Sequence, residues 1–149
     1  APDEADGAGI PDAARIEAMI NGNRLQQMAL YKQTSFDSSG KKTLATVYVS
    51  AGSTIRSVIS WDACPRVKDI NGWTGNGTHA DLDLHLIDPN GNRVSNGASY
   101  DQSYEIVEVV ANISGLYTLE IQKFGWDRCD VLYDGTKDYT YLGLAYDIR

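Results

Sequence analysis

The stretch that determines the fold of this chain is 80–91, with the sequence ADLDLHLIDPNG. Its leucines alternate with Asp81, Asp83 and His85, which predicts a β-strand with one apolar face and one acidic face. The Asp-Pro-Asn-Gly sequence at 88–91 is typical of a tight turn and ends the strand. Two carboxylates with period-two spacing repel each other on one face of a strand, so the pattern also predicts water or a cation between them.

Short strands separated by turn residues continue on both sides of this stretch. We predict strands over 44–49, 54–61, 82–88, 105–111, 116–122 and 140–148, and a further short strand through 26–33. Gly- and Asn-containing turns separate them, at 38–40, 51–53, 90–91, 96–97 and 114–115. Many short strands with such turns predict an all-β fold, an antiparallel jelly-roll-like β-sandwich.

The N-terminal part of the chain contains one helical pattern. Residues 11–20 predict a short helix that begins near a proline and ends at Asn21 and Gly22. Apolar residues recur along it with helical spacing, at Ala13, Ile16, Met19 and Ile20.

The composition limits the possible functions. With 149 residues the chain is long enough for one domain that buries about 70% of its unfolded surface. Its net charge of −7 argues against nucleic acid, because a phosphate-binding surface needs clustered Lys and Arg, and Lys41-Lys42 is the only basic pair. No apolar run approaches the length of about 20 residues that a membrane helix requires.

The two cysteines, Cys64 and Cys129, are far apart in the sequence and form no C-x-x-C motif. We favour a single structural disulfide, which predicts a secreted or extracellular protein. In the loop-entropy model a bridge of this span contributes about 4 kcal/mol. The alternative is two unpaired buried thiols.

Calcium is the cation that the acidic residues suit best, since it binds six to eight oxygens. Asp81 and Asp83 offer two carboxylates on one face of a strand. Asp101 and Glu105 lie in the next connection, and Asp62 follows the preceding strand. We predict that these five residues bind calcium; the alternative is that they are solvated acids on an outer face.

No catalytic constellation is evident. The sequence lacks a G-x-S-x-G motif, and its two histidines, His79 and His85, flank the acidic strand. We expect His85 to hydrogen-bond an aspartate on that face rather than to activate a nucleophile. This chain is therefore predicted not to be an enzyme.

The longest irregular stretch is 62–78. It contains Trp73 and several Gly turns and is a candidate recognition loop. Together with Trp126, Trp73 could form an aromatic platform for carbohydrate. Ordinary packing at the edge of the sandwich explains both tryptophans equally well.

Residues 54–148 resemble the accessory β-sandwich that follows the catalytic domain in many secreted subtilisin-like serine proteases, a jelly-roll type related to proprotein-convertase and bacterial pre-peptidase C-terminal domains. Residues 7–14 look like the final helix of such a catalytic domain. The segments that carry the resemblance are Trp-Asp at 61–62, Asp-Leu-Asp-Leu at 81–84, Pro-Asn-Gly at 89–91, Glu-Ile-Val at 105–107, Gly-Leu-Tyr-Thr-Leu at 115–119 and Asp-Tyr-Thr-Tyr-Leu at 138–142.

The resemblance implies a non-catalytic C-terminal part of an exported subtilisin-like protease. Residues 1–35 would be a linker with a remnant helix of the catalytic domain, and 36–149 the accessory β-sandwich. Its partner would be its own catalytic domain, and its role stability, substrate positioning or secretion. The alternative is a free-standing extracellular binding module for glycan or matrix protein.

Overall fold

The computed structural model describes residues 13–22, 24–62, 67–69, 72–74, 80–97, 103–126 and 139–149. One helix and ten strands follow each other along these residues, with a single 3-10 turn, η1 (Gln33–Ser35), after the first strand. They are α1 (Ala13–Asn21), β1 (Leu25–Lys32), β2 (Lys41–Val49), β3 (Thr54–Trp61), β4 (Val67–Asp69), β5 (Gly72–Thr74), β6 (Ala80–Ile87), β7 (Arg93–Gly97), β8 (Tyr104–Val110), β9 (Gly115–Trp126) and β10 (Tyr139–Ile148).

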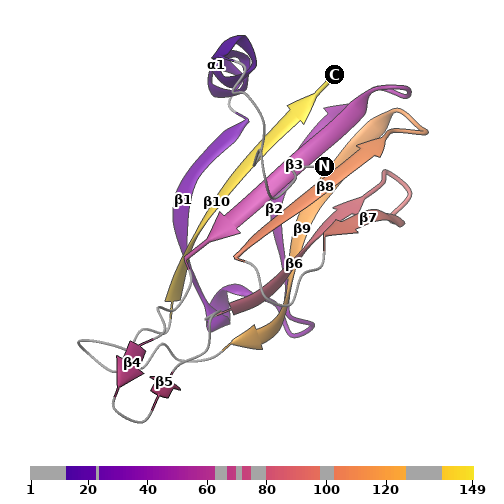
Figure 1. Cartoon of the computed structure of the whole chain (residues 1–149). Coiled ribbons are helices and arrows are strands. Elements are labelled where there is room, and N and C mark those ends of the chain that lie inside the picture. Colours follow the sequence, from indigo (N-terminus) through magenta and orange to yellow (C-terminus); the bar gives the residue numbers. More distant parts are fainter. Residues whose placement is uncertain are drawn as a thin grey trace.

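Eight of these strands form two antiparallel four-stranded sheets that face each other as a sandwich (Figure 1). The first sheet has the order β1-β10-β3-β8 and the second β2-β9-β6-β7. β1 thus pairs with β10, β2 with β9, β3 with β8 and β6 with β7. This nested pairing is the strand order of a jelly roll, and the predicted all-β sandwich with a short N-terminal helix is confirmed.

The core lies between the sheets. The leucines of β6 point inward with 0% exposure, and every second residue of β9 meets them there. Burying one such side chain contributes about 1.5–3 kcal/mol. The fully buried core residues of these strands and of β3 include Leu82, Leu84, Leu86, Tyr117, Leu119, Ile121, Ile55 and Ile59.

Two contacts tie the sheets together at their margins. The Trp61 indole at the end of β3 donates a hydrogen bond from Nε1 to the Ala80 carbonyl oxygen, at 3.0 Å. Gly97 at the end of β7 packs against β8, where a Cβ would lie 2.9 Å from the Ile106 carbonyl oxygen. A side chain at this position is therefore incompatible with the close approach of the two strands.

Most predicted elements are confirmed, with shifted ends. Two regions differ. β7 was missed because Asn96-Gly97 suggests a turn, whereas both residues belong to the strand. The stretch 62–78 was predicted to be irregular, but β4 and β5 within it pair as an antiparallel hairpin.

The short strand predicted through 26–33 is β1, which pairs with β10 in the first sheet. The sandwich therefore takes a strand from before residue 36, where we predicted a boundary; the division into 1–35 and 36–149 itself stays a prediction. Within the described residues, no helix is long and apolar enough to cross a membrane.

Candidate binding site

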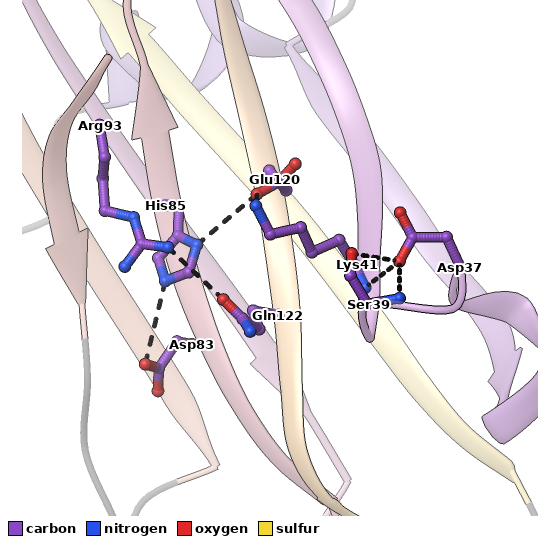
Figure 2. A network of polar contacts seen from close by, with 8 residues as sticks. All are labelled: Asp37, Ser39, Lys41, Asp83, His85, Arg93, Glu120 and Gln122. Carbon is purple, nitrogen blue, oxygen red and sulfur yellow. Dashed lines mark hydrogen bonds and ion pairs between the residues drawn. The ribbon is translucent and has the colours of Figure 1, made fainter. Parts of the chain in front are cut away.

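A polar cluster occupies the outer face of the second sheet. The alternation that buries the leucines of β6 turns Asp83 and His85 outward, and across the strand pair they face Gln122 and Glu120 of β9. Arg93 extends from β7 on one side, and Lys41 from β2 on the other (Figure 2). The six residues Lys41, Asp83, His85, Arg93, Glu120 and Gln122 are called the His85 cluster below.

His85 is buried although it belongs to an outer face, with 0% of its side chain exposed. Its Nε2 lies 3.9 Å from Asp83 Oδ2, and its Nδ1 lies 3.7 Å from Glu120 Oε1. Both distances are longer than a hydrogen bond, and neither ring nitrogen has a hydrogen-bond partner among the residues that the structure describes. The predicted hydrogen bond between His85 and an aspartate is therefore wrong.

Glu120 is held from the other side by Lys41. The Lys41 Nζ and Glu120 Oε1 form an ion pair at 3.3 Å, but the angles of this contact do not suit a hydrogen bond. Lys41 is positioned by the turn before β2, where Asp37 Oδ1 accepts hydrogen bonds from the Ser39 and Lys41 backbone N–H groups. These bonds, that from Lys41 above all, hold the pKa of Asp37 below its usual value.

Burial in this region disfavours the charged forms of Asp81, Asp83 and His85. Burial raises the pKa of Asp81 and Asp83, and at Asp83 the neighbouring Asp81 charge raises it further while Arg93 opposes the shift. Burial also lowers the pKa of His85, and Arg93 adds to that effect while Glu120 acts against it. The cluster thus holds a neutral imidazole between two carboxylates.

This arrangement costs stability. A buried polar atom without a hydrogen bond costs about 1–3 kcal/mol, because it has lost its water and gained no partner. The described part of the chain gives His85 no compensating hydrogen bond. Unsatisfied buried polar groups cluster at functional sites, where a ligand supplies the missing contact.

Exposed apolar side chains flank the His85 cluster on the same strands. Tyr48 of β2 and Leu116 of β9 are cross-strand partners and are 61% and 59% exposed. Further along β9, beyond Gln122, Phe124 is 59% exposed. The outer face of the second sheet therefore combines enclosed carboxylates with large apolar side chains at its ends.

The predicted calcium ligands do not come together among the described residues. Asp81 and Asp83 share the outer face of β6, but Glu105 points into the sandwich from β8 with 4% exposure. Asp62 follows β3 and accepts hydrogen bonds from the Thr140 hydroxyl and the Tyr141 backbone N–H. Asp101 lies outside the described residues.

Across the described residues, no three His, Cys, Asp or Glu side chains gather as a metal site. Calcium binding at Asp81 and Asp83 stays a prediction.

Of the two tryptophans in the predicted aromatic platform, the structure describes the side chain of Trp126. This residue ends β9 rather than lying in a loop. Its ring packs edge-on against the ring of Phe36, with 5.8 Å between the two ring centroids. Trp73 belongs to β5, and its side chain lies outside the described part of the structure, as do Cys64 and Cys129 with their predicted disulfide. Trp126 is therefore engaged in packing at the end of the sandwich.

Four members of the His85 cluster were missed from the sequence: Lys41, Arg93, Glu120 and Gln122. The alternation along β9 signals that Glu120 and Gln122 share an outer face. Nothing local in the sequence indicates that β9 pairs with β6 in the register that places Glu120 beside His85.

Comparisons with known proteins give little. A scan against family models finds no match, and a search of curated proteins finds none. Among solved structures, the chain is similar to PliG of Aeromonas hydrophila, described as a periplasmic lysozyme inhibitor of g-type lysozyme. The two share 14% identity over 83% of this chain and 87% of that one, with a TM-score of 0.40.

The predicted relationship to subtilisin-like proteases is wrong. No family model matches the chain, and the similar solved structure is described as a lysozyme inhibitor, not as part of a protease. The predicted parent protease and its catalytic domain as partner are wrong for the same reason. The motifs misled because they serve the jelly roll itself: the leucines fill the core, Trp61 bonds to Ala80, and Asp88 closes the turn by accepting from Asn90 and Asn92.

Proposed function

We propose that this chain is a non-catalytic binding module that docks a cationic segment of a protein partner on the outer face of its second sheet. The observation that carries the proposal is the His85 cluster, in which a fully buried imidazole lies between two carboxylates without a hydrogen bond to any described residue. A cationic side chain from a partner would bring N–H donors close enough to hydrogen-bond both carboxylates.

Charge complementarity favours a cationic partner. The chain carries 20 acidic and 13 basic residues, and its net charge of −7 attracts positively charged proteins at long range. The apolar side chains beside the cluster add the second ingredient of a protein interface. Tyr48 and Leu116 are large, exposed and paired across the outer face, as anchor residues are.

The location of the protein is a proposal of its own. We place it outside the cytoplasm, because a disulfide between Cys64 and Cys129 would need an oxidising compartment. Alkylation of the purified protein before and after reduction, followed by mass spectrometry, tests this. Two thiols that react without reduction would contradict it.

Calorimetric titration tests the docking proposal. The probe is a synthetic peptide of alternating arginine and leucine, and the control peptide has glutamate in place of arginine. We expect binding of the first peptide alone, weakened about tenfold or more by Asp83→Asn combined with Glu120→Gln, because two charge-assisted contacts are lost.

A matched double variant on the other sheet serves as the control. Glu108→Gln with Asp147→Asn removes the same charge from the outer face of the first sheet and should leave the affinity unchanged. Equal weakening by both double variants would mean that the peptide senses only net charge, and the proposed site would be wrong.

A further inference from the structure

We infer that Arg93 occupies, in the free protein, the position that the partner's cationic side chain takes in the complex. This inference rests on the proposed function and concerns the same site. Arg93 would be a weakly held internal competitor that the partner displaces, and the group that replaces it would be the guanidinium of a partner arginine.

The contacts of Arg93 are unusually poor for a guanidinium. Its Nη2 donates a hydrogen bond to Gln122 Oε1 at 3.4 Å, and within the described part of the chain this is its single polar contact. A guanidinium carries five donors and normally forms bidentate pairs with carboxylates. Arg93 thus lies among acceptors without using most of its donors.

Arg93 nevertheless acts on the centre of the cluster. Its charge lowers the pKa of both His85 and Asp83. Figure 2 shows its side chain reaching from β7 past His85 toward Gln122. The positive charge therefore already lies where the carboxylates need one, but without the short contacts that would fix it.

The backbone position of Arg93 explains why these contacts stay long. β7 is a short edge strand, and its pairing with β6 shifts register between Leu86 and Ile87, where Arg93 lies opposite Ile87. Arg93 must therefore reach across His85 to contact β9. A long, exposed side chain held by one weak bond has several rotamers of similar energy and is displaced at little cost.

A guanidinium arriving from solvent has no such restraint. Asp83 Oδ2 and Glu120 Oε1 flank opposite ring nitrogens of His85, so a planar cation above the imidazole has an acceptor on each side. Arginine suits this geometry better than lysine, because its donors form a rigid fork and its plane stacks on rings.

Competition makes the experiment unusual, because loss of a positive charge from the site should improve binding. With the arginine–leucine peptide as probe, we expect Arg93→Gln to bind about threefold to tenfold more tightly than the wild type, since the displaced ion no longer competes. The same peptide with lysine in place of arginine should bind more weakly to both proteins.

Arg56→Gln is the matched control. It removes the same charge from the outer face of the first sheet, where Arg56 pairs with Glu108, so it should leave the affinity within a factor of two of the wild type. Thermal melting of both variants verifies that they fold.

The outcomes separate the two proposals. If the wild type binds and Asp83→Asn weakens it, but Arg93→Gln binds no better, Arg93 is part of the docking surface and the competitor role is wrong. Equal gains from Arg93→Gln and Arg56→Gln would show an effect of net charge alone and would also overturn it. If neither the wild type nor Arg93→Gln binds, the proposed function fails and this inference with it.

Discussion

On the outer face of the first sheet, five charged side chains form a connected chain of ion pairs, whereas on the outer face of the second sheet His85 is buried without a hydrogen bond to any described residue. The first chain runs through pairs of 3.4–3.8 Å that are partly exposed to solvent, and its members are Arg24, Asp147, Arg149, Glu108 and Arg56. Both faces belong to the same jelly roll, so the fold does not dictate this difference.

The difference separates two uses of charge. Exposed pairs such as Arg56–Glu108 contribute about 0–1 kcal/mol each and need no partner, because water already solvates them. In the His85 cluster the central imidazole is buried without a hydrogen bond to any described residue, and its two polar neighbours on β9 are contacted only loosely by Lys41 and Arg93, so a partner can supply closer contacts. The first face is compatible with a free protein, and the second is suited to a complex.

The largest effect on the free energy of unfolding should come from a substitution in the core between the two sheets. Leu84→Ala on the inner face of β6 removes a fully buried side chain and should lower the free energy of unfolding by about 2–5 kcal/mol. Urea denaturation measures this. If an outer-face substitution cost as much as Leu84→Ala, the outer faces would be structural and the comparison would not hold.

Replacing a buried polar side chain by an apolar one should change the free energy of unfolding with opposite sign on the two sheets. Thr140 of the first sheet is fully buried and donates to Asp62, so Thr140→Val should cost about 1–3 kcal/mol. His85→Leu removes an unsatisfied group and should leave stability unchanged or raise it by about 1 kcal/mol. A loss of more than 1 kcal/mol in His85→Leu would show that the imidazole is satisfied in solution.

The buried histidine also predicts a pH dependence. Because the pKa of His85 is lowered from 6.5 in the folded state, the unfolded chain takes up a proton first as the pH falls below 6.5. Stability should therefore be full above pH 6.5 and decrease below it. Urea midpoints measured in EDTA should decrease between pH 7 and about 5 in the wild type but not in His85→Leu. Identical profiles would contradict the assignment.

Removing a single charge should change the stability only slightly, and in opposite directions on the two outer faces. Glu108→Gln breaks exposed ion pairs and should destabilise by at most about 1 kcal/mol, less in high salt. Asp83→Asn removes a carboxylate whose pKa is raised by burial, so it should stabilise slightly at pH 7. Destabilisation by both substitutions would erase the distinction between the faces.

Calcium should have the smallest effect. Two carboxylates on one strand form at most a weak site, so millimolar calcium should stabilise the protein by about 1 kcal/mol or less. Thermal melting with calcium and with chelator measures this, and Asp81→Asn with Asp83→Asn should abolish any shift. An unchanged melting temperature would remove the predicted calcium site.

The sequence predicted the inner faces well and the site poorly, for a physical reason. Alternation such as that of Leu82 and Leu84 is local, and it survives in the structure because one face of each strand must be buried. The site depends on register between strands distant in sequence. His85 meets Glu120 because β9 crosses to pair with β6, and short motifs carry no information on that pairing.

The position of β10 bears on how the protein acquires its structure. β10 lies between β1 and β3, so β1 stays separate from the β3–β8 pair until residues 139–148 join them. Pairing of the earliest strand with the latest is a contact of high sequence separation, which slows folding to about milliseconds or seconds. During synthesis, both inner edges of that sheet are open and prone to aggregation, so the sandwich closes only after β10 has been made.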